Sequence, residues 1–329
     1  MVLLGVDGGG TTTHVLVAGS DGSVLGAAVG AASNWENVGI VGAGEALRAS
    51  VLEALGEAHA PASDVEAAVF GLAGLDWDDD RRRLSVVPDS LRFGGPSDVV
   101  NDAFVALRAG STRPFGVVVV GGTGSVAAGR NTAGETFRTF GLGRTFGDAG
   151  GGAEISEDAV RAVSEAWLGK GPPTALAETL CRTAGVDDVP RLLEELSRGR
   201  IDPAGFLPEV VRAADAGDAV ACSLLDRAGR ELAGSAAAVI RRLGMEGDTF
   251  EIVLSGGVLR SSRLVRERLI AELAPVAPSA STVLLSTMPV VGSVLLAIEL
   301  AGTEASLEVH ARLAEAAMQR FHPAVTEPA

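Results

Sequence analysis

Cysteine is scarce in this sequence, and its shortage excludes two kinds of site. The 329 residues include two cysteines, Cys181 and Cys222, which lie far apart and form no C-x-x-C pair. Disulfide frameworks and zinc sites need several cysteines at characteristic spacings, so neither is indicated. We expect both side chains to be buried thiols.

Lysine is scarcer still, because Lys170 in the segment WLGKGPP is the one lysine of the chain. A Walker P-loop requires G-x-x-x-x-G-K followed by Ser or Thr. Lys170 has neither the upstream glycine spacing nor the following hydroxyl, so any nucleotide must be bound without a P-loop lysine. The formal net charge is −15 and the pI is near 4.7. This balance argues against a nucleic-acid partner, because phosphate backbones are bound by clustered Lys and Arg.

Long apolar runs are also missing. No stretch approaches the roughly 18 uninterrupted apolar residues of a membrane span, and the N-terminus lacks the basic lead and cleavage site of a signal peptide. We therefore expect a cytoplasmic protein with no membrane partner. The hydrophobic content of 47% is ample for packed cores, and 329 residues exceed what one core usually covers, so two domains are expected.

The expected elements repeat one plan twice. VLLGVDG, TTHVLVAG and SVLGAAV are typical of three successive strands, and alternating helices and strands follow. GVVVVGGTGSVAAGR and ETFRTFG begin a second set of three strands, followed by an inserted layer of helices, a long helix and the strands FEIVLSGG and STVLLS. Helices are expected in VGSVLLAIELAG and in EASLEVHARLAEAAMQRFH, and the last residues are expected to be loose. The repeat predicts two α/β units with a cleft between them, to which each unit offers a glycine turn.

The first glycine turn is VDGGGTTTH. Glycine is poor strand material, so three in succession after a strand need a reason. Gly8, Gly9 and Gly10 would let a phosphate approach backbone N–H groups, and Thr11 and Thr12 would add hydroxyl donors. Asp7 would repel that phosphate unless a hydrated Mg²⁺ lay between them. The alternative is a plain β-hairpin with a glycine turn.

A second turn, VVVVGGTGSVAAG, matches G-x-G-x-x-A, which invites a dinucleotide-binding interpretation. That fingerprint must open a helix, whereas SVAAGRNTAG is typical of a strand and hairpin, so we reject NAD binding. We interpret Gly122, Thr123, Gly124 and Ser125 as a second phosphate cradle, with a structural hairpin as the alternative.

A third glycine pair occurs in LSGGVLRSSRL, between an expected strand and a helix. Gly256 and Gly257 could lie flat against a base or ribose there. An ordinary βα turn is the alternative.

Polar side chains follow at the expected strand ends. Asn101 and Asp102 stand where a strand ends and a helix begins, so Asp102 could accept the proton of an attacking hydroxyl, or could simply cap the helix. Asn34 and Asp148 are short side chains suited to sugar hydroxyls. Trp35 fits either packing or a sugar platform, and packing is the more common role.

The ordered set of motifs resembles the actin-like/hexokinase/Hsp70 ATPase superfamily, and within it the BadF/BadG/BcrA/BcrD and N-acetylglucosamine kinase branch. The similarity extends to about Gly302 and rests on GVDGGGTTTH, SNW, VVNDAFVAL, VVVVGGTGS, GLGRTFGDAGGG and SGGV. It implies an α/β fold of two ribonuclease H-like (actin-like ATPase) domains with an interdomain cleft. We expect the N-terminal domain at 1–113, the C-terminal domain with a helical insertion at 114–303, and a C-terminal helix and tail at 304–329.

The resemblance implies an ATP-dependent kinase that phosphorylates the 6-hydroxyl of an amino sugar, with N-acetylglucosamine as the expected substrate and ATP and Mg²⁺ as cofactors. Asp7 would lie on the hydrated Mg²⁺, and Asp102 would be the catalytic base. The residues implied in ATP binding are Gly9, Gly10, Thr11, Thr12, Gly122, Thr123, Gly124, Gly256 and Gly257. Those implied in sugar binding are Asn34, Trp35, Asn101, Asp102, Thr123, Gly143 and Asp148.

Two departures from the family pattern G-W-G-x-x-x-G-D-E-G concern the sugar: Leu142 replaces the tryptophan and Ala149 the glutamate. Two alternatives stay open. One is an ATPase activator of a 2-hydroxyacyl-CoA dehydratase or benzoyl-CoA reductase system, although Cys181 and Cys222 do not match its iron–sulfur ligands. The other is a non-catalytic sugar or nucleotide sensor. The expected partner is a small-molecule sugar, and the sequence leaves open whether the protein is a homodimer.

Overall fold

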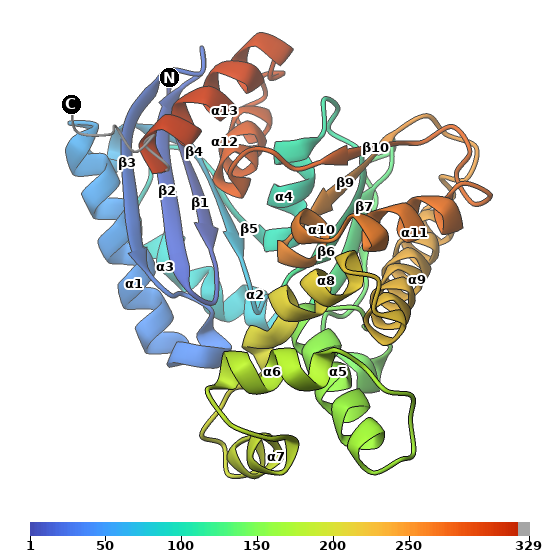
Figure 1. Ribbon diagram of the computed structural model, residues 1–329. Coiled ribbons are helices and arrows are strands. Elements are labelled where there is room, and N and C mark those ends of the chain that lie inside the picture. The colour runs from blue at the N-terminus through green and yellow to red at the C-terminus, as the bar shows by residue number, and fades with distance from the viewer. Residues whose placement is uncertain (322–329) are drawn as a thin grey trace, which may run out of the picture. The chain divides into compact units, whose positions relative to one another are not determined.

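The computed structural model describes residues 1–321, which form two compact units (Figure 1). The first contains Met1–Gly116 together with the chain from Leu285 onward, and the second contains Val117–Leu284. No helix within residues 1–321 combines the length and the apolar character that a membrane span requires.

The first unit is built on a five-stranded sheet in the order β3-β2-β1-β4-β5. Its strands are β1 (Val2–Gly8), β2 (Thr12–Gly19), β3 (Val24–Ala31), β4 (Val65–Leu72) and β5 (Ser97–Asn101). β1, β2 and β3 pair antiparallel, and β4 and β5 continue the sheet parallel to β1. The three successive strands predicted at the N-terminus are therefore confirmed.

Helices cover both faces of this sheet. They are α1 (Trp35–Glu57), η1 (Ala62–Asp64), α2 (Asp78–Leu84), α3 (Val86–Leu91), α4 (Asp102–Gly110), α12 (Pro289–Leu300) and α13 (Leu307–Phe321). Successive strand residues point to opposite faces. Leu4 and Val6 accordingly belong to one buried cluster with Leu47 and Val51 of α1, while Gly5 lies against Val294 of α12.

The second unit has a sheet in the order β10-β9-β6-β7-β8. Its strands are β6 (Gly116–Gly121), β7 (Ser125–Arg130), β8 (Thr136–Arg138), β9 (Glu251–Ser255) and β10 (Ser281–Leu284). Its helices are η2 (Arg144–Phe146), α5 (Gly152–Trp167), α6 (Leu176–Ala184), α7 (Val189–Ser197), η3 (Pro203–Phe206), α8 (Leu207–Asp215), α9 (Ala219–Arg242), α10 (Gly257–Ser261) and α11 (Arg263–Leu273). The inserted helical layer and the long helix predicted from the sequence are confirmed.

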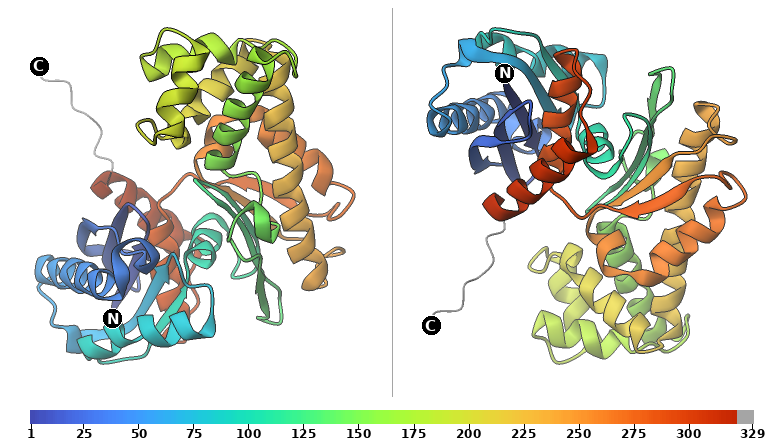
Figure 2. Two further views of the ribbon diagram at one scale, coloured as in Figure 1. Left: turned by 90° about the horizontal axis from the view of Figure 1, so that it is seen from below. Right: turned by 90° about the horizontal axis from the view of Figure 1, so that it is seen from above.

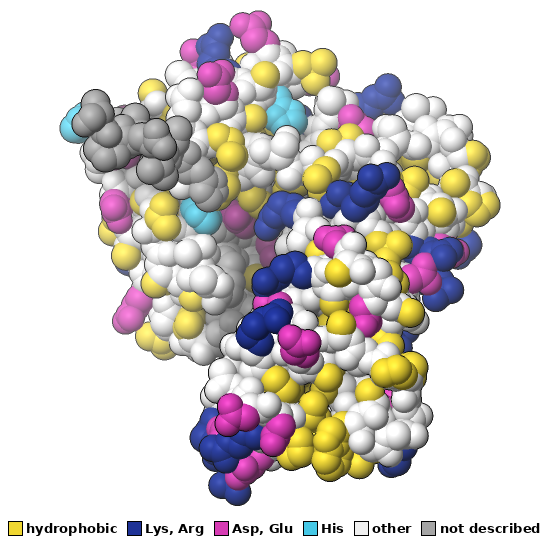
Figure 3. Space-filling view, viewed as in Figure 1, with side chains coloured by type: hydrophobic (Ala, Val, Ile, Leu, Met, Phe, Trp, Pro, Cys, Tyr) yellow, Lys and Arg dark blue, Asp and Glu magenta, His cyan; other side chains and the backbone are white. Residues whose placement is uncertain are grey.

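The surface of α7 shows how the charges are distributed. Basic and acidic side chains are interspersed there (Figure 3), and Arg191 and Arg198 both pair with Glu194. Exposed pairs of this kind contribute little stability.

Cys181 is buried as expected, whereas Cys222 is only half-buried, which corrects that part of the prediction.

Helix α12 belongs to the first unit although it follows the second in the sequence. It lies beside β1 and α4 (Figure 2), and Ser293 Oγ donates to the carbonyl oxygen of Val6 at 2.7 Å.

The compact units therefore differ from the predicted domain limits, because the chain returns to the first unit at Leu285 and not after 303. The predicted C-terminal helix is present as α13, and the expected loose tail, residues 322–329, lies outside the described part of the chain.

Glycine allows α12 to approach α4 at backbone distance. A Cβ on Gly292 would lie 1.9 Å from the carbonyl oxygen of Val105 and 2.7 Å from the backbone nitrogen of Ala109. Arg108 of α4, only 4% exposed, also pairs with Glu299 of α12 at 2.6 Å. Because neither obstacle is a flexible side chain, α12 cannot carry a larger residue at 292 without moving α4.

We predict that Gly292→Ala lowers the free energy of unfolding by roughly 1–3 kcal/mol, because the added methyl overpacks the α12–α4 contact. Chemical denaturation measures the change. Gly56→Ala is the matched control: Gly56 is also helical and in the first unit, but a Cβ there meets nothing within 4 Å. The control should be neutral or stabilising, by up to about 1 kcal/mol. Equal stability of the Gly292→Ala variant and wild type would contradict the packing argument.

Candidate functional site

The turn between β1 and β2 is a short hairpin with an exposed tip. Gly9 N–H donates to the Thr12 carbonyl at 3.0 Å and closes the turn, while Gly10 and Thr11 are exposed. Buried apolar strand residues hold both sides of the hairpin, so only the glycine and threonine tip reaches solvent. The strand, glycine turn and strand predicted here are confirmed, and the tip can present N–H and hydroxyl groups to a ligand.

The SNW motif binds the backbone of this hairpin at Gly9. The backbone N–H groups of Ser33 and Asn34 both donate to the Gly9 carbonyl, at 3.0 and 3.1 Å. The hydroxyl of buried Thr13 lies 2.8 Å from Ser33 Oγ. A Cβ on Gly8 would lie 2.4 Å from that same oxygen. Gly8 is therefore required for packing, and two motifs that are separate in the sequence form one structure.

Asn34 and Trp35 both shape the start of α1. Asn34 Oδ1 caps the helix by accepting from Glu36 N–H at 3.0 Å. The Trp35 indole N–H donates to the Gly74 carbonyl at 2.6 Å, and its ring packs against the first core. These contacts give Trp35 a packing role. The side chain of Asn37, on α1, borders Gly10 in the turn between β1 and β2. The sequence did not predict this contact, because the two residues belong to different elements.

At the end of β5, the two polar residues have different roles. Asn101, 6% exposed, caps α4 by accepting from Ala103 N–H at 3.1 Å, and its amide donates to the Leu75 carbonyl at 3.2 Å. Asp102 is the first residue of α4. The alternative that Asp102 caps the helix is therefore wrong, because the preceding asparagine already does so.

Asp7 and Asp102 influence one another electrostatically. Burial first, and then the negative charge of Asp102, raise the pKa of Asp7 from 3.8 to about 7. Close carboxylates of this kind either retain a proton or accept a cation. Carboxylate oxygens are the ligands that hard divalent cations prefer, so the pair can bind such a cation.

In the second unit, the turn between β6 and β7 packs on the start of α5. Gly122 N–H donates to the Gly124 carbonyl at 2.9 Å. Gly152 and Ala153 donate in turn to the carbonyls of Gly122 and Thr123, at 2.8 and 3.0 Å. β7 follows the turn directly, so the prediction of a strand at this point is confirmed. Thr123 and Gly124 are exposed.

The other glycine segments of the second unit contact this turn. A Cβ on Gly256 would lie 2.3 Å from the Gly121 carbonyl oxygen, and one on Gly151 would lie 2.6 Å from that of Thr123. Ser125 Oγ donates to the Ala149 carbonyl at 3.0 Å. The structure thus brings three segments together: 121–125, 149–152 and 256–257.

Asp148 closes the loop that precedes α5. It is 4% exposed, and its Oδ2 accepts from the N–H groups of Gly141 and Leu142 at 2.8 and 3.2 Å. Gly143 in the same loop has a φ of 88°, a conformation that favours glycine. Asp148 therefore stabilises the conformation of this loop.

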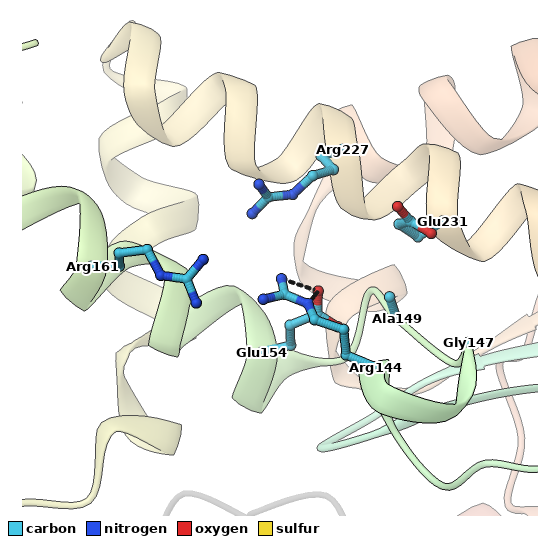
Figure 4. Close-up of a pocket in the computed structure, with 7 residues that line it drawn as sticks. All are labelled: Arg144, Gly147, Ala149, Glu154, Arg161, Arg227 and Glu231. Atoms are coloured by element: carbon cyan, nitrogen blue, oxygen red, sulfur yellow. Dashed lines mark hydrogen bonds and ion pairs between the residues drawn. The ribbon is translucent and has the colours of Figure 1, made fainter. Parts of the chain in front are cut away.

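A cavity of about 380 Å³ lies beside this loop, and it is not among the sites predicted from the sequence. Figure 4 shows Arg144 and Glu154 joined in an ion pair, with Arg161 of α5 and Arg227 of α9 extending toward them. Gly147, Ala149 and Glu231 complete its lining. Asp158 also pairs with Arg144. The spacing of Glu154 and Asp158, which places both acids on one face of a helix, could have predicted this part of the charged cluster.

The predicted site residues therefore form two sets. One lies in the first unit, around Asp7, the first glycine turn, the SNW motif and the start of α4. The other lies in the second unit, around Gly122, Thr123, Gly124, Gly143, Asp148, Gly256 and Gly257. Within each set, contacts join motifs that are distant in the sequence.

These two α/β units with glycine turns after buried strands define a class of fold, which solved sugar kinases share. A ROK hexokinase from Thermus thermophilus matches with a TM-score of 0.58 at 19% identity, covering 91% of this chain and 99% of its own. A candidate N-acetylglucosamine kinase from Chromobacterium violaceum matches with a TM-score of 0.69 at 26% identity, covering 90% and 98%. The fold is that of the actin-like ATPases.

The sequence comparison identifies the family. The model of the BadF/BadG/BcrA/BcrD ATPase family matches residues 4–297, and the chain belongs to that family. The N-acetylmuramic acid/N-acetylglucosamine kinase of Clostridium acetobutylicum is 30% identical over 79% of this chain and 86% of its own. The N-acetyl-D-glucosamine kinase of Dictyostelium discoideum is 28% identical over 90% and 98%.

The raised pKa of Asp7 predicts a pH dependence of stability in metal-free protein. Since the folded-state pKa lies above the unfolded-state value, the stabilising contribution is present below pH 4 and is lost as the pH rises through 7. Asp7→Asn should therefore be more stable than wild type near pH 8, and this advantage should shrink toward pH 4. Thermal unfolding in EDTA across this range measures it.

Asp89→Asn serves as the control, because Asp89 is an exposed carboxyl on α3 of the same unit. Its stability relative to wild type should not follow this profile. A pH-independent difference between Asp7→Asn and wild type would contradict the assignment.

Proposed function

We propose that this protein is an ATP-dependent kinase that transfers the γ-phosphoryl group of ATP to the 6-hydroxyl of an amino sugar. The observation that carries the proposal is Asp102, which begins α4 without capping it and lies close enough to Asp7 to raise its pKa. A base and a cation ligand side by side are what phosphoryl transfer to an alcohol requires.

The nucleotide would be held mainly by backbone groups. We assign its phosphates to Gly9, Gly10, Thr11 and Thr12 in the first unit and to Gly122, Thr123 and Gly124 in the second, and its adenosine to Gly256 and Gly257. The exposed tips of both turns support this assignment. Positioning and charge neutralisation dominate phosphoryl transfer, so a lysine is not needed. We infer that the two compact units act as the two ribonuclease H-like domains of such a kinase.

The cation would be Mg²⁺, held through water by Asp7. The residues present fit it, because burial and then the negative charge of Asp102 raise the pKa of Asp7, and a divalent cation would offset both unfavourable effects on the carboxylate. When bound, Mg²⁺ supplies charge neutralisation at the phosphate oxygens. Asp7 would position it. Asp102 would accept the proton of the sugar hydroxyl as that oxygen attacks the γ-phosphorus, and the bond from phosphorus to the β–γ bridging oxygen would break with ADP as the leaving group. The turn N–H groups would hold the phosphates.

The sugar would be bound by Asn34, Asn101, Thr123, Gly143 and Asp148, with Trp35 supporting Asn34 through α1. N-acetylglucosamine is the proposed substrate because the similar kinases of Clostridium and Dictyostelium are named for it. N-acetylmuramic acid, also named for the Clostridium enzyme, belongs in the same test. The activator alternative has less support, since these relatives are kinases.

Asp102→Asn should lower kcat about 10²- to 10⁴-fold, because proton transfer to a positioned base contributes a factor of that size. ATP binding, measured by calorimetry, should be retained. Asp98→Asn is the control: it removes a carboxyl from β5, the strand that leads into α4, but one that pairs with Arg81 at the surface. A near-normal kcat for Asp102→Asn would leave Asp102 without a catalytic role.

A panel of N-acetylglucosamine, N-acetylmuramic acid, glucosamine and glucose with Mg-ATP tests the substrate. We expect turnover of at least one N-acetylated sugar, with phosphorus attached at the 6-position in the NMR spectrum of the product. Sugar binding by calorimetry without turnover of any of the four would indicate a sensor and overturn the proposal.

A further inference from the structure

The loop of residues 139–150, between β8 and α5, is rich in glycine and has few apolar anchors. Gly141, Gly143, Gly147 and Gly150 all have positive φ angles. Phe140 and Phe146 are 51% and 63% exposed, so their rings do not anchor the loop. Backbone hydrogen bonds from Phe146 and Gly147 to the carbonyls of Gly143 and Arg144, at 2.9 and 3.0 Å, shape the middle of the loop. Asp148 and the Ser125–Ala149 hydrogen bond hold its end, and polar contacts with α5 add to these.

Arg144 supplies such a contact. Its guanidinium group bonds Glu154 through Nε at 2.8 Å and Asp158 through Nη1 at 3.3 Å, and its Nη2 contacts both acids. These bonds, led by that to Asp158, raise the pKa of Arg144 above its usual value. A guanidinium group that bridges two carboxylates is fixed in orientation as well as in position.

The middle and the C-terminal end of the loop are both attached to the first turns of α5. Glu154 holds Arg144 through Oε1 and accepts from Gly150 N–H through Oε2 at 3.0 Å. Asp148 lies between these two attachments, and Gly143 directly precedes the first of them. Both residues are proposed sugar contacts. Their positions therefore depend on the acids of α5.

Asp158 is the centre of the cluster. It is 4% exposed and pairs with Arg144, with Arg161 of α5 and with Arg227 of α9. The lining arginines are balanced by Glu154, Asp158 and Glu231, so the cavity has no excess positive charge that would favour an anionic ligand. What the arrangement provides is a rigid link between the loop and two helices.

We infer that Glu154 and Asp158 are positioning residues that act through Arg144 to hold Gly143 and Asp148 in the conformation that binds the sugar. The inference rests on the proposed kinase function. It differs from a purely stabilising role in one respect: disturbing the cluster should weaken sugar binding selectively and leave ATP binding unchanged.

Arg144→Ala is the primary test, because Asp158 keeps Arg161 and Arg227 as partners, so no buried charge is left unpaired and the fold should survive. We expect the KM for the sugar to rise about tenfold or more, since small displacements of positioning groups are costly. The KM for ATP should stay unchanged. Arg144→Lys should restore little, because an ammonium group cannot bridge two carboxylates in the same way.

Asp158→Asn tests whether the acid acts through the arginine. If it does, the double variant Arg144→Ala/Asp158→Asn should raise the sugar KM no more than the stronger single variant. Asp226→Asn is the matched control, because it breaks an ion pair with Arg268 between α9 and α11 in the same unit but does not contact the loop. It should leave both KM values unchanged.

Amide hydrogen exchange separates failure of this inference from failure of the proposed function. Exchange of residues 141–149 should increase in Arg144→Ala and Asp158→Asn but not in Asp226→Asn, whether or not any sugar is turned over. Unchanged loop exchange, or a wild-type sugar KM in Arg144→Ala, would overturn the inference. A third result is loop protection that depends on Arg144 in a protein that binds no sugar. That result would overturn the kinase proposal, but it would still show that Arg144 holds the loop through Glu154 and Asp158.

Discussion

The close backbone packing of α12 in the first unit is the constraint on which the carboxylate pair depends. Gly292 lets α12 lie on the backbone of α4, and Gly5 lets it lie on β1, where a Cβ would be 2.6 Å from Val294 N. Ser293 adds a hydrogen bond to Val6, the residue before Asp7. The strand that carries Asp7 and the helix that begins with Asp102 are thus fixed to one helix, so the two acids cannot separate to relieve their repulsion.

Glycines in the motifs serve two different purposes that the sequence does not distinguish. Gly8, Gly151 and Gly256 face backbone or buried side chains so closely that a Cβ would clash. Gly124 and Gly257 have open space where a Cβ would stand. Packing explains the first group. It does not explain the second, and those are the positions where close approach of a ligand remains the best physical reason for glycine.

The sequence predicted the element order well, because strand alternation, glycine turns and helical periodicity are local signals. It offered Asp102 as a possible cap of α4, whereas Asn101 is the cap, since both residue types are good caps and helix ends are not placed to the residue by local signals. It also missed the cluster around Asp158. Arg144 and Arg227 lie 14 and 69 positions from that residue, and only the folded chain shows that they converge on one buried carboxylate.

The departure at Ala149 concerns what the loop presents, not how it is built. The contact that ties this position to the second glycine turn runs from Ser125 Oγ to the backbone carbonyl of Ala149 and does not involve its side chain. The loop's other anchors, Asp148 and Arg144, are likewise independent of residue 149. Replacing the glutamate of the family pattern with alanine therefore removes a carboxylate beside Asp148 while preserving the backbone. In the proposed sugar site, the identity of the sugar would therefore be more sensitive to this substitution than the ability to transfer phosphate.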